Sequence, residues 1–130
     1  MTAIIEVYEP CSKVRHYANK AKSIAKRSNH RCRHGAVIWK GSRVSIGYNK
    51  IKNNSKFMDH SCSVHAEHDA LKKHPKPRNA WCLSIRLDKL GNFAMAKPCE
   101  DCERVLVEAG IRNIIYSDPS SETGFRYMKV

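Results

Sequence analysis

The strongest hydrophobic pattern in the first third of the chain is helical. Apolar residues recur three or four positions apart, which predicts an amphipathic helix with one buried stripe. The stripe consists of Val14, Tyr17, Ala18, Ala21, Ile24 and Ala25. Ser12 precedes it and is the expected N-cap. The other side of this helix carries Lys13, Arg15, Lys20, Lys22, Lys26 and Arg27. We therefore expect the helix to have one buried face and one basic face. The basic face is either simply solvated or binds phosphates.

Strands alternate with helices along the rest of the chain. A hairpin is predicted where the turn signal Gly41-Ser42 separates two apolar runs. The later elements follow in the order helix, strand, helix, strand, over residues 64–73, 81–87, 99–109 and 114–116. This order implies an α/β sheet of two or three layers with parallel members. Residues 1–11 are expected to form an N-terminal arm or an edge strand.

Length and hydropathy limit the class of protein. The chain has 130 residues, the length of a single domain, so we expect one domain over residues 1–130. No apolar run approaches the ~20 residues of a membrane helix, and the first residues lack the layout of a signal peptide. The sequence therefore predicts a soluble, cytoplasmic protein with no membrane partner.

Charge is distributed unevenly along the chain. Lys and Arg number 24 and Asp and Glu 12, which gives a net charge of +12. Residues 1–34 hold eight basic and two acidic side chains, residues 35–98 twelve and four, and residues 99–130 four and six. The positive field thus belongs to the first three quarters of the chain. Such a field attracts polyanions or phosphorylated substrates, although solubility alone is the alternative.

Two short motifs carry the candidate chemistry. One is His65-Ala66-Glu67, and the other is the C-x-x-C pair Cys99 and Cys102 after Pro98. Both motifs are predicted to begin helices, and on a first helical turn the two sulfurs share one side. Two thiolates and one imidazole are three tetrahedral zinc ligands. Three protein ligands leave a fourth position for water, which is typical of a catalytic zinc site.

Glu67 supplies a carboxylate beside this predicted site. It lies two residues after His65, close enough to reach the water without binding zinc. A carboxylate there can take a proton from water and deliver it to a ring nitrogen and then to a leaving amine. These parts suit hydrolytic deamination of a heterocyclic base, and H-x-E followed by P-C-x-x-C is the signature of the zinc nucleobase deaminases.

The chain resembles the cytidine deaminase superfamily over about residues 12–118, and most of all its cytidylate and deoxycytidylate deaminase type. The further matching segments are Gly47-Tyr48-Asn49, Cys62, Glu108-Ala109-Gly110-Ile111 and Ile114-Ile115-Tyr116. The resemblance implies a three-layer α/β fold with a mixed sheet of four or five strands flanked by helices. It also implies one catalytic Zn²⁺ per chain and allows a homo-oligomer.

The resemblance implies a role for each matching residue. His65, Cys99 and Cys102 would hold zinc, and Glu67 would shuttle protons. The backbone N–H groups of Ala66 and Cys99 would meet the carbonyl or ring acceptor of the base. Asn49 would contact the sugar hydroxyl or the base, although a turn role at the end of the hairpin is the alternative. The segment that starts at Tyr116 would also line the substrate.

The substrate stays open between a free cytosine nucleotide and single-stranded nucleic acid. The motifs favour deamination of a cytidine or deoxycytidine nucleotide. The net charge favours an editing deaminase that acts on cytosine or adenine in a single strand of DNA or RNA. Met95, three residues before Pro98, departs from the nucleotide-deaminase pattern, which usually has Thr there.

A non-enzymatic reading of the same motifs also exists. A structural zinc site would need a fourth ligand, and Cys62 or His68 could supply it. The protein would then be a nucleic-acid-binding module with no catalytic activity. His60 and Cys62 could alternatively hold a second zinc ion.

Overall fold

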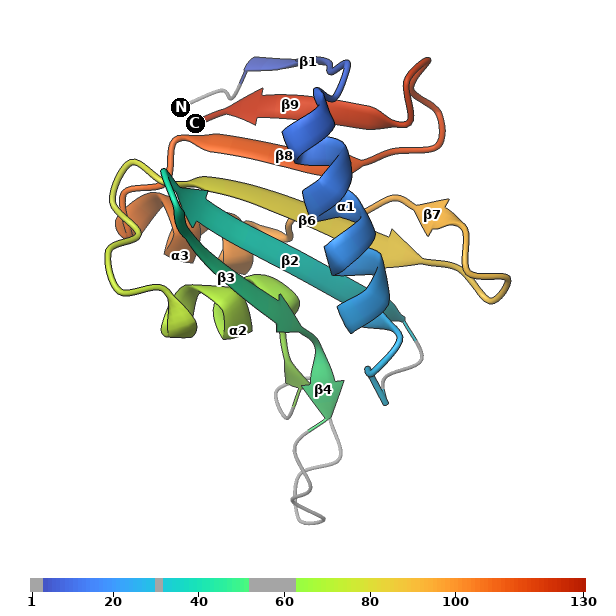
Figure 1. Ribbon diagram of the computed structural model, residues 1–130, viewed down its shortest axis with the longest axis horizontal. Coiled ribbons are helices and arrows are strands. Elements are labelled where there is room, and N and C mark those ends of the chain that lie inside the picture. Colours follow the sequence, from blue (N-terminus) through green and yellow to red (C-terminus); the bar gives the residue numbers. More distant parts are fainter. Residues whose placement is uncertain (1–3, 30–31, 52–62) are drawn as a thin grey trace.

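The computed structural model describes residues 4–29, 32–51 and 63–130. Its elements form three layers, with a central sheet between one helix on one face and two helices on the other (Figure 1). The three-layer α/β architecture expected from the resemblance is therefore confirmed. His60, Cys62, Lys52 and Lys56 lie outside the described residues.

The main sheet has seven strands, so the expected number of four or five was too low. Six strands lie in the order β1 (Ile4–Val7), β9 (Phe125–Lys129), β8 (Asn113–Ser117), β6 (Trp81–Leu87), β2 (Arg33–Lys40) and β3 (Arg43–Tyr48), and β7 (Phe93–Ala94) pairs with β6. The β6–β8 pair is parallel and the other pairs are antiparallel. A separate two-stranded sheet joins β4 (Lys50–Ile51) to β5 (Ser63–Val64).

The extra strands are those with the weakest sequence pattern. All four residues of β1 are exposed, so burial imposes no alternation on them, and β7 has only two residues. Residues 4–7 are thus an edge strand, which was one of the two expectations for the N-terminal segment. Pairing with β9, and not hydrophobic periodicity, defines β1.

Helix α1 (Ser12–Ala25) packs on one face of the sheet. Its N-cap is Cys11, one residue earlier than expected. Its small side chains allow a close approach, because a Cβ added to Gly35 of β2 would lie 2.2 Å from the carbonyl oxygen of Ala21. Glycine at position 35 therefore sets the distance between helix and sheet.

Helices α2 (Ala66–Lys73) and α3 (Glu100–Glu108) cover the opposite face. A Cβ on Gly47 of β3 would lie 2.4 Å from the backbone nitrogen of Ala70, so α2 also packs directly on the strand backbone. The sheet thereby fixes the position of α2 and of the residues at its start. No helix in the described part of the chain is both long and apolar enough to cross a bilayer.

Two hydrophobic cores follow from the alternation of side chains along the strands. Val37, Leu83 and Ile85 pack under α1. Ala36, Cys82 and Ile114 face α2 and α3 instead. Successive residues of one strand thus face opposite layers, and Ser84 of β6 contacts Glu67 of α2.

Candidate metal centre

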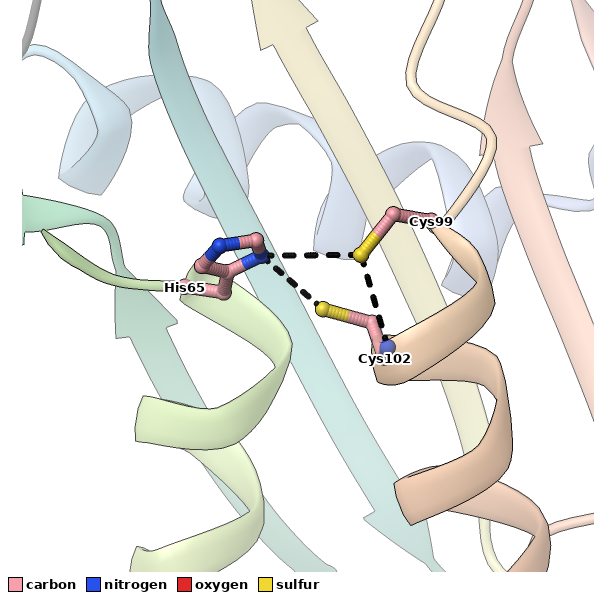
Figure 2. Close-up of side chains that lie close together, drawn as sticks. All are labelled: His65, Cys99 and Cys102. Atoms are coloured by element: carbon pink, nitrogen blue, oxygen red, sulfur yellow. Dashed lines mark hydrogen bonds between the residues drawn. The ribbon is translucent and has the colours of Figure 1, made fainter. Parts of the chain in front are cut away.

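The candidate metal ligands lie at the N-terminal ends of two neighbouring helices. His65 is the N-cap of α2, and Cys99 is the N-cap of α3. Cys102 lies in the first turn of α3. Figure 2 shows the imidazole and the two thiols pointing toward one another from these two helices. The sequence motifs, 34 residues apart, are therefore brought together by the packing of α2 beside α3.

The distances between the donor atoms suit a tetrahedral zinc ion. His65 Nδ1 lies 3.0 Å from Cys102 Sγ and 3.9 Å from Cys99 Sγ, and the three donor atoms lie within 4.8 Å of one another. Tetrahedral zinc with Zn–N near 2.0 Å and Zn–S near 2.3 Å places a nitrogen and a sulfur about 3.5 Å apart. The observed distances lie on both sides of this value, so this donor set fits zinc.

Only three donors form this group among the described residues. His68 is not part of it, although its ring lies 5.7 Å from the ring of His65. Cys62, the other fourth ligand considered above, lies outside the described residues. Within the described chain, the arrangement is therefore the three-donor kind that leaves one coordination position open.

The environment of Cys102 disfavours its thiolate form unless a cation is bound nearby. Burial raises the pKa of the Cys102 thiol well above its ordinary value, and the adjacent Glu67 and Cys99 raise it further. The Cys102 backbone N–H meanwhile donates a hydrogen bond of 3.4 Å to Cys99 Sγ. Metal binding requires deprotonated thiols. A divalent cation would therefore offset the cost of the negative charges gathered here.

Glu67 is buried and held in a fixed orientation. Its side chain is in the first turn of α2, and the residue is 3% exposed. Ser84 of β6, which is fully buried, donates a hydrogen bond of 2.6 Å to Glu67 Oε1. Our sequence reasoning missed Ser84. The available signal was a single hydroxyl within the apolar run Trp81–Ile85, and its partner could not be identified without the fold.

A cavity of about 170 Å³ opens at the candidate ligands. Besides His65, Glu67, Cys99 and Cys102, it is lined by Cys32, His34, Asn49, Ala66, Lys97 and Pro98. Lys97 is the one Lys or Arg among these described lining residues, and it precedes Pro98 directly. The residues of both motifs thus line one cavity with the basic side chain of Lys97, which the motif analysis did not single out.

Asn49 lines this cavity while its side chain binds the backbone of a neighbouring segment. Its Nδ2 donates a hydrogen bond of 2.6 Å to the Cys32 carbonyl, and its Oδ1 accepts one of 2.8 Å from the His34 N–H. The amide therefore joins the end of β3 to the segment around the start of β2. Asn49 therefore has both the structural role expected at the end of the hairpin and a place in the cavity wall.

Tyr116 lies elsewhere. It is 2% exposed on β8, within the core cluster that contains Leu106 of α3 and Ile114, and it is not among the described residues that line the cavity. Burial raises the pKa of its phenol. Tyr116 therefore shares a core cluster with Ala66 but is not part of the described cavity wall.

A buried carboxylate connects α2 to the end of β3, the strand that precedes Asn49. Asp69 Oδ2 accepts hydrogen bonds from the Tyr48 N–H at 3.2 Å and from Lys73 Nζ at 3.0 Å. Lys50 Nζ lies 3.4 Å from its other oxygen. Burial alone would raise the pKa of Asp69, but these donors and cations hold it below the ordinary value. Asp69 thus fixes the end of β3 against the helix that carries Glu67.

The fold and the site together define a three-layer α/β protein whose described residues include a three-donor His/Cys/Cys candidate zinc site beside a buried glutamate. The family model described as "Cytidine and deoxycytidylate deaminase zinc-binding region" matches residues 8–118. The chain belongs to this cytidine and deoxycytidylate deaminase family. The membership identifies the protein as a hydrolytic deaminase and zinc as its cofactor.

Solved structures share the fold. A dCMP deaminase from the cyanophage S-TIM5 is 21% identical with a TM-score of 0.63, and the match covers 84% of this chain and 86% of that one. A cytidine deaminase from Burkholderia pseudomallei is 17% identical with a TM-score of 0.63, covering 88% and 91%. One from Mycobacterium tuberculosis is 24% identical with a TM-score of 0.56, covering 79% and 82%. A comparison with curated protein sequences gives no match.

Proposed function

We propose that the protein removes the exocyclic amine of cytosine in a cytidine or deoxycytidine nucleotide by zinc-dependent hydrolysis and releases ammonia. One observation carries this proposal. Three zinc-type donors and the buried Glu67 line a single cavity in a chain that belongs to a deaminase family.

His65, Cys99 and Cys102 would hold the zinc ion, which when bound supplies a Lewis acid that activates water at neutral pH. The remaining chemistry belongs to Glu67. Its Oε1 accepts the hydrogen bond from Ser84, so Oε2 is the oxygen that takes a proton from water. The same atom then delivers the proton to the ring nitrogen and afterwards to the leaving amine.

Backbone groups at the helix starts suit the binding of the base. The first N–H groups of a helix have no partner inside the helix, and Ala66, the first residue of α2, is buried in the cavity wall. The N–H groups of Ala66 and Cys99 would donate to the carbonyl or ring acceptor of cytosine. The remaining amide N–H of Asn49 would donate to the sugar or the base.

Lys97 favours a nucleotide over a nucleoside. The residue is exposed and lines the same cavity as Glu67. An ammonium at that position provides a charge-assisted partner for a phosphate. A single-stranded polynucleotide is the second candidate substrate, and the net charge of +12 supports it.

A panel assay tests the proposal. The zinc-loaded protein is incubated with CMP, dCMP, cytidine, deoxycytidine, single-stranded DNA and tRNA, and formation of uracil or inosine is measured. We expect uracil formation from CMP or dCMP. Turnover of a single strand with none of the mononucleotides would replace the free-nucleotide proposal with the editing one. No turnover of any substrate by zinc-loaded protein would remove the proposed activity.

Three variants test the assigned residues. His65→Ala and Cys99→Ala should lose zinc in elemental analysis, because each removes one of three protein ligands. Glu67→Ala should keep zinc and the fold but lose nearly all deamination. Full zinc content in both ligand variants would disprove the ligand set. Activity of Glu67→Ala within tenfold of the wild type would disprove its role.

A further inference from the structure

The basic face of α1 is separated from the candidate active site by the sheet. Helix α1 packs on one face, and α2 and α3, which carry the candidate ligands and Glu67, cover the other (Figure 1). No residue of α1 is among the described residues that line the catalytic cavity. The basic side chains of α1 therefore cannot act by contacting a nucleobase in that cavity, and their role needs another explanation.

This face is strongly and uniformly positive. No Asp or Glu occurs in α1, which is Ser12–Ala25, and none occurs at the two basic positions that follow it. Arg15 forms an ion pair with Glu9. Of the other basic residues, Lys13 lies over the ring of Tyr17 and Lys22 over that of Phe93, which leaves their charges uncompensated. Lys20 and Arg27 form no ion pair with any described residue.

Lys20 and Arg27 line a groove between α1 and β3, which we call the α1 groove. Its volume is about 400 Å³, and its lining consists of His16, Asn19, Lys20, Ser23, Ile24, Arg27 and Ile46. Five of these seven side chains can hydrogen-bond, and two are permanent cations. The two isoleucines add a small apolar surface. This combination suits a phosphodiester chain, with phosphates on the polar side chains and a sugar or base on Ile24 and Ile46.

The geometry of the groove favours an extended polyanion over a single phosphate. The polar residues lie in a row along the helix, since His16, Lys20 and Ser23 are four and three positions apart. From His16 to Ser23 the helix rises about 10 Å. Arg27 follows in the turn after the helix, where its backbone N–H donates a hydrogen bond to the Ile24 carbonyl. The row is therefore longer than a single phosphate group, and it can contact successive phosphates of one strand.

A membrane surface is a poorer occupant. A basic helix that binds a bilayer inserts its apolar face, whereas the apolar stripe of α1 is buried against the sheet, with Ala21 and Ala25 fully inaccessible. We propose that the α1 groove binds single-stranded nucleic acid through its phosphates, at a site separate from the catalytic cavity. Because phosphate contacts carry no sequence information, this binding does not depend on sequence.

The test uses a fluorescein-labelled deoxythymidine 12-mer, which contains no cytosine and is not turned over. Its affinity for the zinc-loaded protein is measured by anisotropy between 50 and 200 mM salt. The test variant is Lys20→Gln/Arg27→Gln. The control variant, Lys72→Gln/Lys89→Gln, makes the same change in net charge at exposed positions outside α1. Zinc content and thermal midpoint verify that both variants are folded.

We expect the test variant to weaken binding at least about tenfold at 50 mM salt. Its log–log salt dependence should flatten by about 1.4, because two phosphate contacts are lost at ~0.7 each. The control variant should stay within about threefold of the wild type, and turnover of dCMP should be unchanged in both. Equal losses in the two variants would overturn the proposal, as would the absence of wild-type binding at 50 mM salt. Binding to phosphatidylserine vesicles without oligonucleotide binding would overturn it as well.

Discussion

Replacing Ser84 by Ala should impair catalysis much more than folding. The change removes one oxygen atom at a fully buried position of β6, so it creates almost no cavity. It removes the 2.6 Å hydrogen bond that Ser84 donates to Glu67 Oε1. The Glu67 carboxylate then keeps its place in the helix but loses the contact that fixes its orientation.

The size of the effect follows from the kind of bond. A hydrogen bond to a charged group contributes about 1.5–3 kcal/mol, and each ~1.4 kcal/mol is a factor of ten in rate. If the whole contribution is lost in the transition state, kcat falls about 10- to 150-fold. KM should change little, because Ser84 is not among the described residues that line the cavity.

Ser45→Ala is the matched control. Ser45 is a buried serine whose hydroxyl donates a 2.7 Å hydrogen bond to the Ala70 carbonyl of α2, so the same chemical change is made against the same helix. We expect it to lower the thermal midpoint but to leave kcat within about twofold. The assay compares kcat, KM, zinc content and thermal midpoint for both variants. A zinc-loaded Ser84→Ala protein with kcat within threefold of the wild type would refute the reasoning, as would an equal loss of kcat in Ser45→Ala.

Three further changes have defined outcomes. Lys97→Met should lower kcat/KM for dCMP at least about tenfold and leave kcat/KM for deoxycytidine unchanged. The control Lys89→Met should alter neither value. Equal losses of kcat/KM on both substrates in Lys97→Met would contradict the role of Lys97. Asp69 has a lowered pKa, so its contribution to stability is present above about pH 4 and is lost as the pH falls further. In urea unfolding, Asp69→Asn should therefore lie closest to the wild type at pH 3, and a difference that stays constant from pH 6 to pH 3 would argue against this. Gly47→Ala places a Cβ 2.4 Å from the backbone nitrogen of Ala70, so α2 must shift. Its thermal midpoint and zinc content should both fall, and unchanged values would show that α2 tolerates the methyl group.

Local patterns predicted several elements of the fold and the positions of both site motifs. The helical spacing over residues 12–25 and the hairpin around Gly41 correspond to α1 and to β2–β3. The two motifs also lie at the helix starts where they were expected, since His65 and Cys99 are the N-caps of α2 and α3. In each case the information is carried by neighbouring residues, through periodicity, turn chemistry or motif spacing.

Contacts between distant segments were not predictable in the same way. Ser84 binds Glu67 because β6 runs beneath α2, and the two residues are 17 positions apart in the chain. Tyr116 was expected near the substrate, but the alternation of β8 puts it with Ile114 in the core under α2 and α3. Which face a strand residue occupies depends on the register of the sheet, and that register is set by nonlocal pairing.

The fold also changes what the net charge says about the substrate. From the sequence, +12 favours a polynucleotide substrate, because charge and catalysis belong to one small domain. In the structure, the acid-free helix α1 lies on one face of the sheet, whereas the described cavity contains Lys97 as its one Lys or Arg. Attraction of a polyanion to α1 and choice of a base in the cavity are therefore separable properties. A protein with this layout can hold a nucleic acid by one face while it deaminates a free nucleotide at the other, so affinity for a single strand does not by itself identify the substrate. Only turnover of cytosine within that strand does.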